Sequence, residues 1–404
     1  MDMHPWRPSV RATLSLALVL TFLSGCTMNF RDTLDSRTKV ASVASVQWQH
    51  VGADTWPDFK SEIDAVVAKG SSGPAQVSFL TSPVSASFDG MVLAPSGAIY
   101  SIPYGSGVIV KLNPDTGAIT TFGSGTLPTS RWPGGVLGFN GKIYATPENG
   151  NNILEIDPST DTYRLIPFTM GSNCGAHFHG TAIGPNGKIY GIPACAAQVL
   201  EYDPATDAVA NLNYPLPASV STACWYCWNR GILAPDGKIY GIPNYSDQAM
   251  VIDPATSTVS LLPSMGGVVG QSCGATLAPN GLIFGFDCNG TTKRVVMDPA
   301  AGTSTIYNDI AAVTGGWSSV LAPNGKIYAT TGSGKPLQFD PVTQTATSIT
   351  GPPTGVYSEG GVLAPNGKIY FAQIGNNQIM VVDPKANSNF PLDLLLSPYL
   401  NGSH

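Results

Sequence analysis

Two histidines lie close together in the sequence, at His177 and His179. Residues two apart on a β-strand point to the same side, so both imidazoles would share one face. Together with a carboxylate such as Glu359 they could hold a divalent metal ion. The alternative is that both rings only hydrogen-bond to loop carbonyls. We therefore expect no cofactor, with a divalent ion at His177, His179 and Glu359 as the alternative.

Large aromatic side chains with a few charges give a binding surface apolar area and polar handles. Such residues gather in irregular segments of an otherwise regular sequence, and they predict a surface that binds a protein, peptide or glycan. The alternative is that the aromatic rings cap the core. The candidate ligand-binding residues are Arg131, Trp132, His177, His179, Trp225, Tyr226, Trp228, Trp317, Tyr357 and Glu359.

Seven cysteines are present. Six of them follow an export signal, so three disulfides are expected. Cys273 and Cys288 lie symmetrically about the turn at Asn280 and predict one bridge, whose loop of about 15 residues would contribute roughly 3 kcal/mol. Cys174–Cys195 and Cys224–Cys227 are the first choice among three pairings of the other four, and redox activity of Cys224 and Cys227 is an alternative.

The first 25 residues read as a lipoprotein signal peptide. Arg7 and Arg11 precede an apolar run from Leu14 to Leu23, which is too short to span a bilayer. The following Leu23-Ser24-Gly25-Cys26 resembles the bacterial lipobox, so Cys26 is the expected lipidation site and the new N-terminus. Lipid chains there would anchor the protein in the bacterial cell envelope, and Thr27 favours the outer membrane. An ordinary signal peptide is the alternative.

The charge pattern limits the partners. The net charge is −6, charged residues make up 11% of the chain, and no basic run is present. Nucleic acid is therefore not an expected partner, and the membrane is expected only through the lipid anchor. We expect a monomer.

A sequence repeat sets the positions of the candidate binding residues and the cysteines. Its clearest copies run from Gly231 to Tyr240 and from Gly361 to Tyr370, and an Asp-Pro step follows each copy. A period of 42 to 50 residues made of short strands is typical of a β-propeller with one blade per repeat. The repeat aromatic occurs seven times, at Tyr100, Tyr144, Tyr190, Tyr240, Phe284, Tyr328 and Tyr370.

The predicted fold is all-β, a seven-bladed propeller of four-stranded antiparallel blades, closed by an N-terminal strand. The seventh repeat lacks a good outer strand because Pro391 interrupts its candidate. Val77–Leu80 matches the missing strand, so we expect it to complete the last blade and close the ring.

Four segments follow from these patterns. Residues 1–25 are the signal peptide, and 26–74 are a tether with one helix that begins near Thr55 and packs on the propeller. Residues 75–390 are the propeller. Residues 391–404 form a C-terminal tail, which we expect outside the ring.

In a propeller, the loops that lead into each innermost strand share one face with the loops between the second and third strands. Alignment on the repeat aromatic places the candidate binding residues and all six later cysteines on or beside this face. Other residues placed there are Phe88, Asp89, Tyr104, Glu148, Asn229, Tyr245 and Gln271.

The unit at Leu363–Tyr370 resembles the repeats of extracytoplasmic seven-bladed propellers, including the NHL, SMP-30 and virginiamycin B lyase-like groups. The resemblance covers residues 75–385 and implies the fold. The lyase group uses a His and a Glu around a magnesium ion at the channel mouth. His177, His179 and Glu359 match in type and face, but no motif matches residue by residue, so the activity is not carried over.

The expected function is therefore a lipid-anchored propeller that binds a protein, peptide or glycan on its aromatic channel face. One alternative is a metal-dependent lyase or hydrolase at the channel mouth. The other is a structural envelope protein.

Overall fold

The computed structural model describes residues 56–169, 175–215, 226–267, 271–288, 292–309, 316–331, 336–349 and 358–401. All of these residues belong to one compact unit, 42–404. None of the helices in these ranges is long and apolar enough to cross a membrane.

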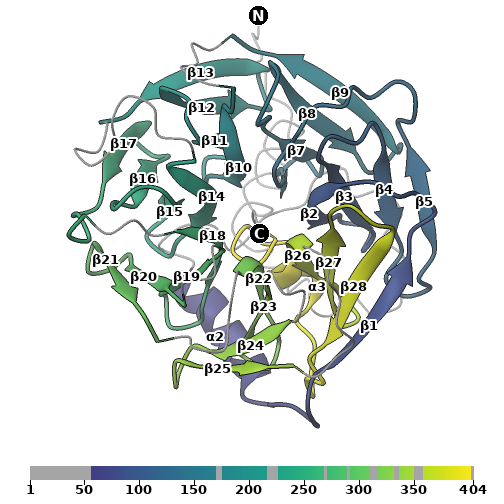
Figure 1. Ribbon diagram of the computed structural model, residues 1–404, viewed down its shortest axis with the longest axis vertical. Helices are drawn as coiled ribbons and strands as arrows, with labels where there is room; N and C mark the ends of the chain where they lie inside the picture. The colour runs from purple at the N-terminus through teal and green to yellow at the C-terminus, as the bar shows by residue number, and fades with distance from the viewer. Residues whose placement is uncertain are drawn as a thin grey trace, which may run out of the picture. The chain divides into compact units, whose positions relative to one another are not determined.

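Seven four-stranded antiparallel sheets surround a central channel, which confirms the predicted seven-bladed propeller (Figure 1). In each blade, strand A is innermost and strand D outermost. Blades one to three contain β2 (Phe88–Leu93), β3 (Ile99–Pro103), β4 (Ile109–Leu112), β5 (Ile119–Phe122), β6 (Val136–Leu137), β7 (Ile143–Ala145), β8 (Asn152–Asp157), β9 (Thr162–Pro167), β10 (Phe178–Ile183), β11 (Ile189–Pro193), β12 (Gln198–Asp203) and β13 (Ala208–Asn213).

The remaining blades follow the same order. Blades four to six contain β14 (Trp228–Leu233), β15 (Ile239–Pro243), β16 (Met250–Asp253), β17 (Thr258–Leu261), β18 (Ser272–Leu277), β19 (Ile283–Asp287), β20 (Arg294–Asp298), β21 (Thr303–Tyr307), β22 (Gly316–Leu321), β23 (Ile327–Thr331), β24 (Leu337–Asp340) and β25 (Thr345–Ser348). Blade seven contains β26 (Ser358–Leu363), β27 (Ile369–Gln373), β28 (Gln378–Asp383) and β1 (Gln76–Thr81).

The N-terminal strand closes the ring as predicted. β1 pairs antiparallel with β28, and Phe79 lies opposite Met380. This pairing supplies the outer strand that the seventh repeat lacks, so blade seven has no missing strand.

The repeat motif joins several pairs of neighbouring blades. The Asn186 side-chain amide of blade three donates to the Pro254 carbonyl of blade four at 2.9 Å. Asn366 and Tyr370 of blade seven donate in the same way to the Pro114 carbonyl of blade one, at 2.8 and 3.1 Å. Where these bonds form, the Pro carbonyl of one blade and the Asn or Tyr of its neighbour are both needed, which explains why they recur together in the repeat.

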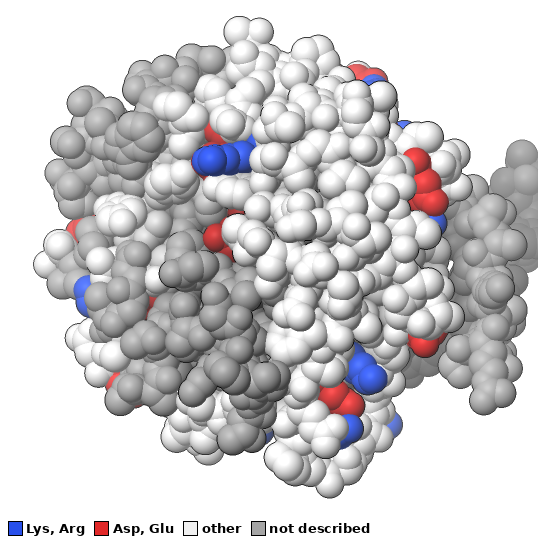
Figure 2. All heavy atoms as spheres, turned by 45° about the vertical axis from the view of Figure 1, so that its right-hand side comes forward, with Lys and Arg blue, Asp and Glu red and all other residues white. Residues whose placement is uncertain are grey.

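The surface of the described part carries few charges. Figure 2 shows isolated Lys, Arg, Asp and Glu side chains on a largely uncharged face, with no broad patch of one sign. Many of these charges pair between strands of one blade, as Lys188 does with Glu201 at 2.7 Å.

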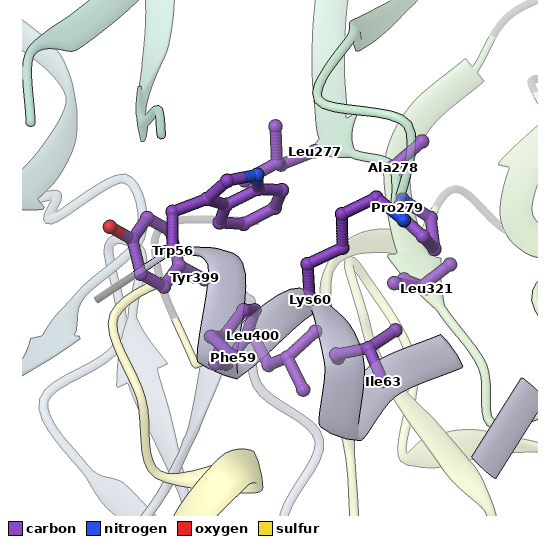
Figure 3. Close-up of a pocket in the computed structure, with 10 residues that line it drawn as sticks. All are labelled: Trp56, Phe59, Lys60, Ile63, Leu277, Ala278, Pro279, Leu321, Tyr399 and Leu400. Carbon is purple, nitrogen blue, oxygen red and sulfur yellow. The ribbon is translucent and has the colours of Figure 1, made fainter. Parts of the chain in front are cut away.

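The predicted helix is present as α2 (Trp56–Val67), and Phe59, Ile63 and Val66 are its buried residues. It packs under blades five and six. A cavity of about 10 Å³ lies between the helix and these blades. Figure 3 shows its lining residues, which include Leu277 and Leu321. That volume holds at most about one water molecule, so the cavity is a packing defect rather than a ligand site.

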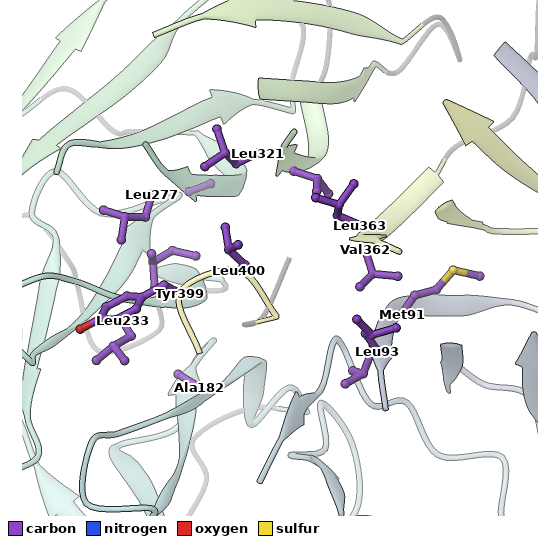
Figure 4. Packing of buried hydrophobic residues seen from close by; sticks show 14 of the residues in the cluster. Met91, Leu93, Ala182, Leu233, Leu277, Leu321, Val362, Leu363, Tyr399 and Leu400 are labelled. Atoms are coloured by element: carbon purple, nitrogen blue, oxygen red, sulfur yellow. The ribbon is translucent and has the colours of Figure 1, made fainter. Parts of the chain in front are cut away.

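The C-terminal segment lies inside the ring, contrary to expectation. Short helix α3 (Leu392–Leu395) leads to Tyr399 and Leu400, which are only 4% and 6% exposed. Figure 4 shows Leu400 among the ends of the inner strands, facing Leu277 and Leu321. The leucine-rich sequence explains the difference, because such a tail loses hydrophobic free energy if it remains in water.

Asn401 fixes this segment in place. Its side-chain amide donates to the Leu93 carbonyl at 2.7 Å, and its side-chain oxygen accepts from the Leu93 amide at 3.0 Å. Leu93 ends β2 next to an A–B turn. The C-terminal segment therefore closes the channel at the end where the A–B and C–D turns lie, which we call the turn face. The opposite end is the mouth face.

Candidate functional site at the channel mouth

Counting back four residues from the last residue of strand A gives an equivalent position in each of the seven blades. A β-bulge lies at or next to this position in six of them. A bulge re-aims side chains and often lies beside a functional site. The seven residues are Asp89, Pro133, His179, Asn229, Cys273, Trp317 and Glu359.

The residue that follows this position is usually glycine, and the structure shows why. A Cβ on Gly180 would lie 2.6 Å from the Arg230 Cα of the next blade, and one on Gly90 would lie 2.8 Å from the Gly134 Cα. Blades four and six depart from the pattern, with Arg230 and Ser318. The φ of Arg230 is +51°. A non-glycine residue in this conformation is strained, and such strain is often kept at functional sites.

Arg230 reaches across the channel to blade one. Its guanidinium donates to the Asp89 carboxylate, and the two residues are 1% and 0% exposed. The Arg230 Nε and Nη1 atoms are buried and have no protein partner. The channel therefore contains a fixed ion pair with two free donors.

Glu359 of blade seven completes a carboxyl pair with Asp89. Burial, the nearby Asp89 charge and a hydrogen bond to Asp89 raise the Glu359 pKa well above its ordinary value, while Arg230 opposes this shift. Because two close carboxylates cannot both ionise easily, the raised pKa favours the protonated form of Glu359 beside the Asp89–Arg230 ion pair.

A second cluster forms around Glu148, in the loop between β7 and β8 of blade two. The hydroxyls of Tyr104 and Tyr226 donate to its two carboxylate oxygens at 2.6 and 3.0 Å. Arg131 reaches the same carboxylate at 3.4 Å, and its guanidinium lies 5.2 Å from the Tyr104 ring centre. The Glu148 side chain is 4% exposed, whereas that of Arg131 is 50% exposed.

The two histidines lie beside this cluster. His179 Nε2 is 3.9 Å from a Glu148 oxygen, and its ring packs edge-on to Tyr226 at 5.0 Å. Burial lowers the pKa of His179 and of His177, so both are neutral near pH 7. Their Nδ1 atoms are buried without a protein partner. Within the described ranges, no three His, Cys, Asp or Glu side chains converge as a metal-binding group.

Backbone hydrogen bonds hold the mouth loops of blades two to five in one belt. Each bond joins a loop leading into strand A to a loop between strands B and C, alternately within a blade and across to the next blade. Such a belt fixes the side chains that it carries. The bonds run from the amide of Glu148 to the carbonyl of Arg131 (2.8 Å), His177 to Glu148 (2.6 Å), Ala194 to His177 (2.9 Å), Cys227 to Ala194 (2.9 Å), Asn244 to Cys227 (2.9 Å), Gln271 to Asn244 (2.6 Å) and Cys288 to Gln271 (3.1 Å).

Cysteines reinforce this belt. Cys273 and Cys288 are joined by the predicted disulfide. Cys195 and Cys227 each take part in a disulfide bond. Cys174 and Cys224 lie outside the described residues, so the pairings expected for them stay a prediction.

Trp132 and Trp228 do not form part of an exposed surface. Both are completely buried, and their indole N–H groups donate to the carbonyls of Asn152 and Gln248 at 3.0 and 2.8 Å. They occupy the strand A position that Phe88 and Phe178 hold in blades one and three. These rings fill the space between blades, as expected from the alternative that the aromatic rings cap the core.

The structure brings Arg131, His177, His179, Tyr226 and Glu359 together at the mouth. Trp225 and Tyr357 lie outside the described residues, and Trp317 lies in β22. Arg230 is the functional candidate that the sequence did not single out, and its departure from the repeated glycine could have revealed it. Glu148 and Tyr104 were placed on this face but not selected.

No protein-family model matches this sequence, and no curated protein matches it. Solved structures are similar in fold. A streptogramin B lyase structure matches with a TM-score of 0.64 and 16% identity, covering 76% of this chain and 97% of that one. An inactive virginiamycin B lyase from Staphylococcus aureus with quinupristin matches with a TM-score of 0.65, 14% identity and coverage of 76% and 99%. YCF48 bound to D1 peptide matches with a TM-score of 0.56, 11% identity and coverage of 76% and 96%.

Proposed function

We propose that this chain is a binding protein that takes a peptide or a segment of a protein at its mouth face. The observation that carries the proposal is the asymmetry of the channel. The C-terminal segment closes the turn face, whereas the mouth face holds the Glu148 cluster and the Asp89–Glu359–Arg230 cluster. Buried donors and acceptors without partners are costly unless a ligand or water satisfies them.

Peptide is the favoured ligand class for two reasons. The free atoms include donors on Arg230 and an acceptor on Asn229, and a peptide backbone offers both types of partner. A peptide-bound structure, that of YCF48, shares the fold. A glycan is the other ligand class, and it enters as an outcome of the test.

The test is panning of a random heptapeptide phage library, and a glycan array in parallel, against the full-length protein. Tyr245 and Val342 are exposed large side chains, 47% and 84%, on the mouth and turn faces respectively. We expect Tyr245→Ala to weaken enriched peptides about tenfold, as at a modest aromatic hot spot, and Val342→Ala to leave them unchanged. Peptides that respond only to Val342→Ala, or ligands found only among the glycans, would contradict the proposal.

A metal-dependent lyase or hydrolase is the second candidate. It is favoured by the neutral His179 next to Glu148, since a neutral imidazole can act as a general base. Incubation with quinupristin, followed by chromatography, and elemental analysis of the tag-free protein test it. Turnover that is lost with His179→Ala, together with a stoichiometric divalent metal, would replace the binding proposal.

We also propose that a lipid at Cys26 holds the chain in the bacterial cell envelope, at the outer membrane. The lipobox-like Leu23–Cys26 segment supports this location. Labelling with a radioactive fatty acid should mark the wild-type protein and not Cys26→Ala. Equal labelling of both would refute the anchor.

A further inference from the structure

Glu148 is a buried carboxylate whose negative charge is only weakly balanced by a nearby cation. Its two strong partners, Tyr104 and Tyr226, are neutral hydroxyls, and His179 is neutral. Its cationic contact, Arg131, is half exposed and lies at 3.4 Å, longer than an ordinary charge-assisted bond. A buried charge of this kind gains stability from a closer cation.

The position of Arg131 shows which cation fits. Its guanidinium lies near the Tyr104 ring while contacting the Glu148 carboxylate. A planar guanidinium combines these two contacts better than a compact ammonium does. The Arg131 side chain is half exposed and contacts Glu148 through one long bond. Its ion pair with Glu148 therefore has the low energy of a solvent-exposed pair, and a ligand can displace Arg131.

Independent atoms in the same mouth still need partners. The buried His179 has a free Nδ1 atom, and Arg230, 1% exposed, has free Nε and Nη1 atoms. Arg230 points into the channel, as its bond to Asp89 shows. The two Arg230 donors suit a carbonyl oxygen near the cationic group, as in an arginine residue of a peptide.

We propose that Glu148, Tyr104 and Tyr226 form a subsite for a guanidinium group of the ligand, and that Arg131 occupies it as an internal competitor. This inference rests on the proposed peptide-binding function and names the side chain that the peptide inserts. It reverses the role first expected for Arg131, which would be displaced by the ligand rather than hold it.

The test uses N-acetyl-arginine amide as the probe and N-acetyl-citrulline amide as its neutral analogue of nearly the same shape. Binding to the full-length protein is measured by ligand-observed NMR and calorimetry. We expect millimolar affinity for the arginine probe, as is usual for so small a ligand, and none for citrulline. Glu148→Gln should abolish binding.

Arg131→Ala should tighten binding of the arginine probe about two- to fivefold, because it removes the competitor. Arg164→Ala is the matched control. Arg164 is 46% exposed and also pairs with a buried glutamate, Glu155, but it lies in outer strand β9. It should leave the affinity unchanged, which separates displacement from a general change of net charge.

The inference fails if citrulline binds as well as arginine, if Arg131→Ala weakens the arginine probe, or if neither wild type nor Arg131→Ala binds it. These outcomes need no Glu148 variant, so misfolding of Glu148→Gln would not hide them. Heptapeptides that require Tyr245 but contain no arginine would leave the binding function intact while this inference falls. If the arginine probe binds but no peptide ligand is found, this inference stands and the proposed peptide-binding function falls.

Discussion

The guanidinium of Arg230 in blade four binds the carboxylate of Asp89 in blade one, 141 positions earlier in the chain. Blades one and four are not neighbours in the ring, so this ion pair spans the channel. It also joins a strained residue to a buried charge, and it has Glu359 on one side.

We predict strong coupling between these two residues. Arg230→Met or Asp89→Asn alone leaves a buried charge without its partner, and each should cost about 3–5 kcal/mol of unfolding free energy. The double variant should lose clearly less than the sum of the two. Urea unfolding of the four proteins measures this cycle, and additive losses would show that the pair is not coupled.

The protonated Glu359 predicts an unusual pH dependence. The folded state keeps this proton above the ordinary glutamate pKa of 4.5, whereas the unfolded chain releases it. The contribution of Glu359 to stability is therefore full below that value and falls as pH rises toward the raised folded pKa. Glu359→Gln, which keeps a donor to Asp89, should gain stability relative to wild type between pH 5 and pH 8, roughly the interval above the unfolded pKa.

Glu155 offers a control of opposite sign. Its hydrogen bonds and ion pairs with Arg164 and Lys142 outweigh burial and lower its pKa. Its contribution is present above 4.5 and is lost as pH falls through the lowered folded pKa. Relative to wild type, Glu155→Gln should therefore recover stability only at acid pH. If both variants shift in the same direction, the assigned protonation of Glu359 is incorrect.

The Cys273–Cys288 disulfide closes a 15-residue separation within blade five. Its removal in a Cys273→Ser, Cys288→Ser variant should cost about 3 kcal/mol. The loss is measured by denaturant unfolding without reductant. The wild-type chain in the presence of reductant should lose at least as much, and a change below about 0.5 kcal/mol would show that this bridge does not support the fold.

The closure of the turn face by Asn401 can be tested in the same way. Asn401→Ala leaves the buried Leu93 amide and carbonyl without these partners, and it should cost about 1–3 kcal/mol. Asn211→Ala removes an exposed 3.3 Å bond to the Thr169 carbonyl and should change stability by less than about 0.5 kcal/mol. Equal effects of the two substitutions would contradict the closing role of Asn401.

The sequence predicted the regular part of this molecule well because the repeat encodes it directly. The spacing of Tyr and Asp-Pro reflects an inter-blade hydrogen bond, and the missing strand of blade seven pointed to Phe79. The Cys273–Cys288 bridge followed from hairpin symmetry. Each of these inferences depends on local geometry that one repeat transfers to the next.

The site was harder to predict because it depends on contacts between blades. Arg230 and Asp89 have no sequence relationship that marks them as partners. Trp132 and Trp228 look like surface aromatics until their alignment with the buried Phe88 and Phe178 is noticed. The tail around Leu400 has no repeat to indicate where it packs, and only its leucine content signalled burial.

The two ends of the described chain both act on the first and last blades, through the β1–β28 pairing and the Asn401 bond to Leu93. In a variant cut just before Asn401, all seven blades would keep their strands, but Leu93 in blade one would lose two hydrogen bonds to a residue 308 positions later in the chain.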